Sequence, residues 1–142
     1  MGEDVHESLP MRTIICGGRD YVLTDADRAW LDRLKGSLPI TEVVCGMSGT
    51  VDRETGRVIC GADLMSRDWA LERGIRVTPF PAIWRVNRRL DKSAGPRRNQ
   101  AMANHCALSL PAACVAFPGG RGTKDMLAKA EAKGLVIVRR ET

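Results

Sequence analysis

The feature of this chain that most constrains its fold is a repeated alternation of short apolar runs with longer segments of helical period. The apolar runs are predicted to be strands, and they cover residues 12–16, 42–45, 75–78, 113–117 and 135–138. They are apolar throughout, which is typical of parallel strands whose two faces are both covered by helices. The alternation therefore predicts an α/β fold, a doubly wound sheet of about five mainly parallel strands with helices on both faces.

Local signals mark the ends of the predicted helices. Thr24, with Asp27 three residues later, forms a predicted capping box ahead of a helix over 26–38. Gly74 is a predicted C-cap that closes a second helix from about residue 62 to 73. Two more helices are predicted, one opened by a proline and one that follows the fourth strand.

The 142 residues have the length of one ordinary domain, and no repeat or internal linker divides them. We predict a single domain over residues 11–142, preceded by a flexible segment over 1–10 that lacks the features of a secretory signal. No apolar run approaches the roughly 20 residues that cross a bilayer, so no membrane partner is expected. The five cysteines form no CxxC pair, which favours buried thiols in a reducing, cytoplasmic compartment. Neither a metal nor a cofactor is predicted.

Three glycine-bearing turns follow predicted strands. In a parallel sheet the ligand lies beyond the carboxyl ends of the strands, where glycine lets the backbone approach it and the next helix start attracts phosphate. The PGGRGT run over 118–123 offers such a start, with a guanidinium and a hydroxyl as further donors. It matches neither the GxGxxG fingerprint nor a P-loop, because Lys124 follows Thr123 instead of preceding it. The predicted ligand-binding residues of these turns are Gly17, Gly18, Arg19, Asp20, Gly46, Pro118, Gly119, Gly120, Arg121, Gly122 and Thr123.

Side chains outside these turns are further candidates. Asp63, at the start of the second helix, either complements the helix dipole or contacts the ligand. Arg98 and Asn99 lie in the first turn of the third helix, where anions are favoured. Met102 shares a helix face with Arg98, so an inward-facing Met102 would bring Arg98 beside the core and within reach of a cleft. Trp84 either packs over the domain or stacks on a base.

The net charge of +5 is concentrated in one segment. Residues 85–98 hold six lysines and arginines against a single aspartate. The segment is a solvated loop, a phosphate-capturing element or a nucleic-acid contact, and the sequence leaves these three interpretations open. An aromatic content of 4% offers little stacking surface for single-stranded nucleic acid.

Five short motifs carry a resemblance to a known family. They are GGRDY over 17–21, GAD over 61–63, FPAxW over 80–84, AGPxRN over 94–99 and FPGGRGT over 117–123. The chain resembles the YspA-type, YpsA-related branch of the SLOG superfamily over nearly all of residues 11–138. The resemblance implies a Rossmann-like domain, commonly a homodimer, that binds a nucleotide or nucleotide derivative as a sensor or sequestering protein. The family has a compact turn before the position of Asp63, whereas this chain has an additional segment there, over residues 47–59. This segment is either a lid over the site or a surface insertion.

The wider superfamily implies an enzymatic alternative. Its LOG-type members are phosphoribohydrolases with a PGGxGTxxE motif and an Arg-Lys-x-x-Met segment, and residues 98–102 are similar to the second. Met126 stands at the glutamate position, and a thioether can neither stabilise an oxocarbenium-like centre nor activate water. An N-glycosidase acting on nucleoside phosphates would therefore depend on Arg98 as a catalytic residue, together with Asp20 or Asp125. Because the superfamily also has a DNA-processing branch, nucleic-acid binding through 85–98 is the third hypothesis.

Overall fold

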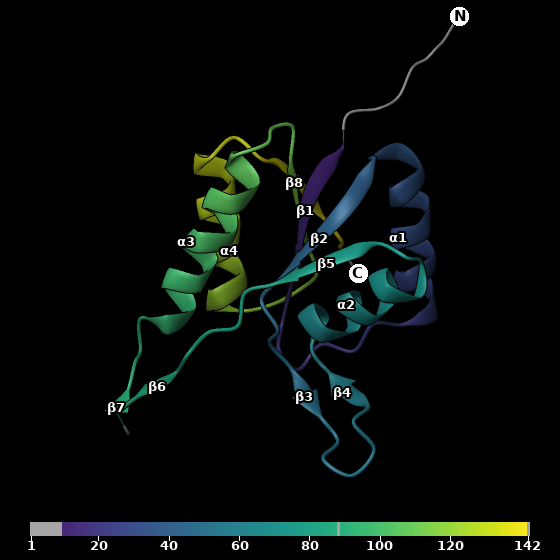
Figure 1. The fold of residues 1–142 in the computed structure, drawn as a ribbon. Helices are drawn as coiled ribbons and strands as arrows, with labels where there is room; N and C mark the ends of the chain where they lie inside the picture. Colours follow the sequence, from purple (N-terminus) through teal and green to yellow (C-terminus); the bar gives the residue numbers. More distant parts are fainter. Residues whose placement is uncertain (1–9, 88, 142) are drawn as a thin grey trace, which may run out of the picture.

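The computed structural model describes residues 10–87 and 89–141, with a five-stranded, all-parallel sheet at its centre (Figure 1). The strand order is β5-β2-β1-β8-β9, so the chain winds outward from β1 to β5, returns across the sheet and winds outward again. The predicted doubly wound, Rossmann-like α/β fold is therefore confirmed. The flexible segment predicted over 1–10 lies outside the described residues, apart from Pro10. The strands are β1 (Met11–Cys16), β2 (Ile40–Cys45), β5 (Arg76–Pro79), β8 (Ala113–Ala116) and β9 (Val136–Arg139).

Helices cover both faces of this sheet. They are α1 (Asp25–Ser37), α2 (Ala62–Glu72), α3 (Ala94–Ala107) and α4 (Arg121–Ala132). Side chains of adjacent strand residues point to opposite faces. Ile14 and Val44 pack with Met102 against α3 and α4, whereas Ile15 and Val43 pack on the side of α1 and α2. Figure 1 shows the two helix pairs on either side of the sheet.

The predicted capping box is present at the start of α1. The Asp27 N–H donates to Thr24 Oγ1 at 3.0 Å, and the Thr24 N–H donates to Asp27 Oδ2 at 3.1 Å. The buried Asp27 also accepts from the Tyr21 hydroxyl and from Arg140 Nε. Gly74 follows the end of α2 with φ +70°, the left-handed conformation expected of a C-cap glycine.

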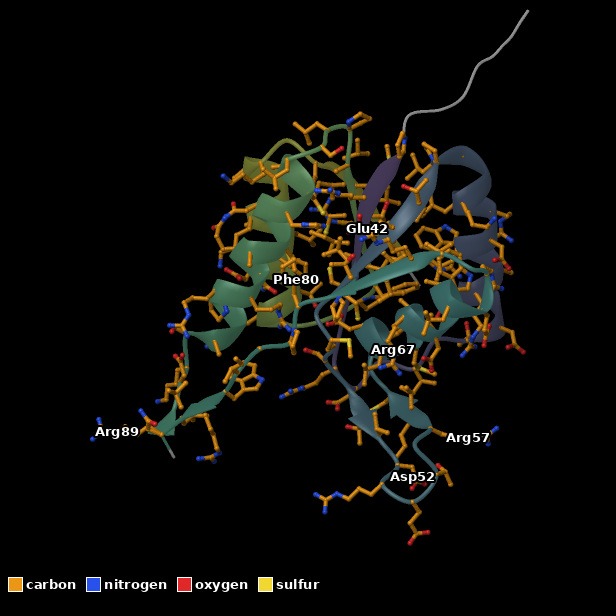
Figure 2. All side chains as sticks on the ribbon, viewed as in Figure 1. Glu42, Asp52, Arg57, Arg67, Phe80 and Arg89 are labelled. Carbon is orange, nitrogen blue, oxygen red and sulfur yellow. The ribbon has the colours of Figure 1, made fainter. Side chains whose placement is uncertain are left out.

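Two β-ribbons interrupt segments that the sequence predicted as loops. The first ribbon consists of β3 (Thr50–Val51) and β4 (Val58–Cys60), and it lies in the additional segment over 47–59 except for Cys60. The second ribbon follows β5 and consists of β6 (Arg85–Val86) and β7 (Arg89–Leu90). Both are antiparallel and extend beyond the carboxyl edge of the sheet (Figure 1). Figure 2 marks the first ribbon by Asp52 and Arg57 and the second by Arg89. Strands of two or three residues are too short for a two-residue period to be recognised in the sequence.

A buried polar network ties α3 to the sheet away from this edge. Glu42 Oε2 accepts from the Thr78 hydroxyl at 2.8 Å and lies 2.7 Å from His105 Nε2. Burial opposes ionisation of Glu42, but the hydrogen bonds from His105 and Thr78 outweigh it and lower the pKa of this carboxyl. The Phe80 ring lies 5.4 Å from the His105 ring, and Figure 2 labels Glu42 and Phe80. This network fixes the helix that carries Arg98 and Asn99. No helix in the described part of the chain is long and apolar enough to cross a membrane.

Candidate functional site

A cavity of about 490 Å³ opens where the strand order reverses, between the carboxyl ends of β1 and β8. This is the position at which doubly wound sheets hold their ligands. Its walls come from the loop after β1 and from the starts of α2, α3 and α4. The predicted site residues that line it are Gly17, Gly18, Arg19, Asp63, Arg98, Asn99, Gly120, Arg121, Gly122, Thr123 and Asp125.

The loops after β1 and β8 lie directly against each other. The Gly18 N–H donates to the Pro118 carbonyl oxygen at 2.8 Å. A Cβ on Gly17 would lie 2.8 Å from the Phe117 Cβ, and one on Gly119 would lie 2.7 Å from the Gly18 nitrogen. Because no side chain fits at either position, these glycines are required for the close approach of the two loops.

Four predicted site residues do not line the cavity themselves. The Pro118 carbonyl oxygen accepts the hydrogen bond from the Gly18 N–H. Gly119 lies so close to Gly18 and Thr123 that a Cβ would meet both. Gly46 contributes its carbonyl oxygen, which accepts a hydrogen bond from Arg98 Nη1. Asp20 is exposed in the turn after Arg19 and is not a lining residue.

The start of α4 presents free backbone donors to the cavity. Its N-cap is Gly120, and no side chain of the described residues makes a capping hydrogen bond there. The first N–H groups of a helix have no partner within the helix, and they carry the positive end of its dipole. Residues 120–123 all line the cavity, so these donors are available to an anion.

Arg98 reaches into the site as the shared face with Met102 predicted. Met102 is 2% exposed, and Arg98 donates from Nη1 to the Gly46 carbonyl and from Nε to Asn99 Oδ1 at 2.9 Å. Arg19 and Arg121 also line the cavity, and both residues are exposed. The adjacent Arg97 points outward and forms an ion pair with Asp91.

The basic segment 85–98 is consequently not a single charged surface. Arg98 lies in the cavity, and Arg97 is paired with Asp91. Arg85 and Arg89 are exposed on the β6–β7 ribbon.

Asp63 brings a buried carboxyl to the same site. It is 6% exposed, and its Oδ2 accepts from the Ser48 N–H at 3.2 Å. Burial raises the pKa of Asp63 to about 6, although the Ser48 hydrogen bond and the charge of Arg98 act in the opposite direction. A Cβ on Gly46 would lie 2.8 Å from both Asp63 Oδ2 and Arg98 Nη1. The carboxyl and the guanidinium therefore flank Gly46, which leaves room for both.

Asp125, predicted as a catalytic residue, is held in a clamp between α3 and α4. Lys129 Nζ donates to its two oxygens at 2.9 and 2.8 Å, and Asn99 Nδ2 donates to Oδ2 at 2.9 Å. Burial opposes ionisation, but these hydrogen bonds lower the pKa of Asp125 overall. Lys129 also donates to the Pro96 carbonyl at 3.0 Å. The arrangement suits an ionised acceptor that joins two helices, and it does not suit an acid that exchanges protons with a ligand.

Several lining residues were not predicted as site residues. They are Cys16, Ser48, Gly95, Pro96, Met102 and Met126. Trp84, for which the sequence left packing and base stacking open, lines the cavity as well. Ser48 lies in the glycine-bearing turn after β2, and Gly95 and Pro96 adjoin Arg98, so proximity in sequence was an available signal. The two methionines and Cys16 belong to the apolar core, and no local pattern distinguishes a core residue that also borders a cavity.

The cysteines provide neither a disulfide nor a metal site within the described residues. Cys16 Sγ and Cys114 Sγ lie 4.0 Å apart on neighbouring strands, and both are buried. The hydrogen bond with Cys114, together with burial, raises the pKa of Cys16 well above its ordinary value, so the thiol stays protonated.

Comparisons of the chain with models of known protein families, with curated proteins and with solved structures found no match. The fold class therefore rests on the observed sheet topology, and the functional argument rests on the site itself.

Proposed function

We propose that this protein binds a phosphate-bearing small molecule, a nucleotide or nucleotide derivative, in the cavity between β1 and β8. The observation that carries the proposal is the uncapped start of α4, which opens on the same cavity as three arginines. Backbone N–H groups at a helix start and planar guanidinium groups are the donors that proteins use for phosphate. The volume of about 490 Å³ lies within the roughly 300–1,000 Å³ typical of small-molecule sites.

Each group in the cavity has a role in this proposal. The backbone of residues 120–123 and the Thr123 hydroxyl hold the phosphate. Arg98 neutralises its charge, and the hydrogen bond to the Gly46 carbonyl orients the guanidinium. Arg19 and Arg121, both exposed, add positive charge at the rim. The carboxyl of Asp63 accepts hydrogen bonds from sugar hydroxyls and sets the position of the Ser48 loop.

Calorimetric titration with inorganic phosphate, AMP, ADP and ADP-ribose tests this function, and two neighbouring arginines provide a matched pair. Arg98→Gln should weaken binding about 10- to 100-fold, because a hydrogen bond to a charged group contributes roughly 1.5–3 kcal/mol. Arg97→Gln should change affinity less than about 2-fold, because Arg97 points outward towards Asp91. If none of these compounds binds, or if both variants weaken binding equally, the proposal is wrong.

A second candidate function is hydrolysis of an N-glycosidic bond in the bound nucleotide, and the buried carboxyl of Asp63 favours it. Water would add to C1′ of the ribose while the C–N bond breaks, and the base would leave with a proton. Asp63 replaces Asp20 and Asp125 as the proposed acid, since Asp20 is outside the cavity and Asp125 is clamped. A carboxyl with a pKa of about 6 is suited to proton transfer near neutral pH. Chromatographic detection of free adenine from AMP, lost in Asp63→Asn, is the expected result; no release by the native protein excludes hydrolysis of AMP.

We also propose that the protein acts as a homodimer in the cytoplasm. Exposed apolar side chains at the ribbon after β5 support an interface, with Ile83 67% and Leu90 54% exposed. The five free cysteines fit a reducing compartment. Native mass spectrometry should show a dimer together with any co-purified ligand, whereas a monomer at micromolar concentration contradicts the dimer.

A further inference from the structure

The three tryptophans of the chain have very different surroundings. Trp69 is 1% exposed, its indole N–H donates to Asp32 Oδ1 at 3.0 Å, and Arg73 lies over its ring. Trp30 is half-buried, packs edge-on against Phe117 and lies under Arg140. Both rings are used in packing.

Trp84 is the exception. It is 40% exposed and lines the cavity. Within residues 10–87 and 89–141, its ring has no aromatic or cationic partner and its indole N–H has no hydrogen-bond acceptor. A large aromatic side chain left in this state on a cavity wall is a common feature of ligand sites.

The position of Trp84 is nevertheless fixed by its surroundings. The edge of its six-membered ring faces Gly95, where a Cβ would lie 2.9 Å from Cη2. Its carbonyl oxygen accepts from the Asp91 N–H. The Asp91 carboxylate in turn accepts from the N–H and the hydroxyl of Ser93 and pairs with Arg97. The root of the β6–β7 ribbon is thereby joined to the start of α3, and the ring edge is held against Gly95.

The cavity lining also combines polar and apolar groups. The cationic and N–H donors come from the loop after β1 and from the starts of α3 and α4. The apolar lining consists of Trp84 together with the sulfur-bearing side chains of Cys16, Met102 and Met126. A bare phosphate or sugar phosphate would use only the polar part. An aromatic ring attached to the phosphate-bearing group would use the apolar part as well.

We infer that Trp84 is the platform on which the planar part of the ligand stacks, so that the ligand is an aromatic base joined to a phosphate. This inference rests on the proposed function and narrows it, because it assigns the base to the wall formed by Trp84 and the phosphate to the start of α4. The β6–β7 ribbon, whose root holds Trp84, is then the element that distinguishes nucleotides from other phosphate esters.

The test compares the binding of AMP with that of ribose 5-phosphate, which lacks the base, in the protein and its variants. Stacking of a base on an aromatic side chain contributes roughly 1–3 kcal/mol, so Trp84→Ala should weaken AMP binding about 5- to 150-fold. The same variant should change the affinity for ribose 5-phosphate less than about 2-fold. AMP should quench the tryptophan fluorescence of the native protein. Trp84→Phe should retain most of the AMP affinity and abolish this quenching.

A second variant and a control guard against a general loss of structure. Gly95→Ala keeps the indole of Trp84 but displaces its edge. It should therefore lower the affinity for AMP and leave the affinity for ribose 5-phosphate unchanged. Trp30→Phe, on the other face of the sheet, should affect neither compound.

The outcomes separate the two proposals. If both compounds bind equally well to the native protein, or Trp84→Ala weakens both equally, the base platform is wrong while phosphate binding stands. If neither compound nor inorganic phosphate binds, the proposed function fails and the platform fails with it.

Discussion

Helices α1 and α4 begin in opposite ways. At α1, Thr24 and Asp27 satisfy each other's backbone N–H groups, and Arg140 and Tyr21 neutralise and bind the same carboxylate. At α4, the N-cap is Gly120, no side chain of the described residues caps it, and no acidic residue stands in the first turn. Both helices follow strands of the same sheet, so the difference does not come from the fold class.

Under the proposed function, this difference separates a helix start that stabilises the fold from one that binds a ligand. The donors of α1 are used within the protein, and that helix start contributes to stability. In the proposed function the donors of α4 bind the ligand, and Arg19, Arg98 and Arg121 line the cavity where a capping carboxylate would otherwise favour stability. Helix α2 is intermediate, since the N–H groups of Gly61 and Ala62 are bonded to the loop after β1 while Asp63 lines the cavity.

The largest effect is expected from Gly119→Ala, which would force the two loops apart at the start of α4. The added Cβ would lie 2.1 Å from Thr123 Oγ1 and 2.7 Å from the Gly18 nitrogen. We expect a loss of unfolding free energy on the order of 2–4 kcal/mol and loss of detectable AMP binding. Gly36→Ala near the end of α1 is the control, because no atom lies within 4 Å of its Cβ and alanine favours a helix by roughly 0.5–1 kcal/mol. Urea unfolding and calorimetry measure both variants, and equal stability of the two contradicts the contact.

The next effect concerns the pH dependence of stability, through Asp63. Its pKa of about 6 lies above the ordinary value of 3.8, so between these values the folded protein binds more protons than the unfolded chain. The contribution of Asp63 to stability therefore falls as the pH rises, by about 1–2 kcal/mol between pH 5 and pH 8. Asp63→Asn should remove this part of the pH dependence in urea unfolding. An unchanged profile for Asp63→Asn would mean that this carboxyl does not titrate near pH 6.

A smaller effect is expected at the capped helix start. Thr24→Ala removes the side chain that accepts the Asp27 N–H and should cost about 1 kcal/mol of stability. The affinity for AMP should not change, because this helix start is not part of the cavity. A parallel loss of AMP affinity would show that the two helix starts are not independent.

The smallest effect on stability is expected at the uncapped helix start. There a substitution should lower the ligand affinity and leave the stability nearly unchanged. Thr123→Val replaces a buried hydroxyl that lines the cavity by a methyl group of similar size. We expect a stability change of less than about 0.5 kcal/mol and a few-fold loss of phosphate affinity, since a single hydrogen bond contributes roughly 0.5–1.5 kcal/mol. Thermal unfolding without ligand and titration with AMP separate the two quantities. A loss of stability with unchanged affinity would assign the hydroxyl to the fold instead of the site.

Much of the fold was predictable from the sequence because its signals are local. The strands are apolar runs, and the Thr24 capping box and the Gly74 C-cap depend on residues a few positions apart. The inward position of Arg98 followed from its spacing to Met102 on one helix face. The two short ribbons were missed, since strands of two or three residues are too short to show a two-residue period.

The candidate site was less predictable where it depends on contacts between distant segments. Asp125 looked available for chemistry, but Lys129 and Asn99 bind both of its oxygens, and the contact from Asn99 spans 26 residues. The burial that raises the pKa of Asp63 arises from packing around the start of α2, which composition does not reveal. Trp84 is placed by the start of α3, ten residues further along.

The clamp that Asp125, Asn99 and Lys129 form between α3 and α4 has a consequence for the kinetics of recognition. Two helices joined in this way present their N-termini in one fixed arrangement before any ligand arrives. A preorganised wall loses little conformational entropy on association, so more of the interaction energy is retained as affinity. Capture of an anion should then proceed at the rate of electrostatically guided diffusion, without a slow folding step, and that rate should fall as ionic strength increases.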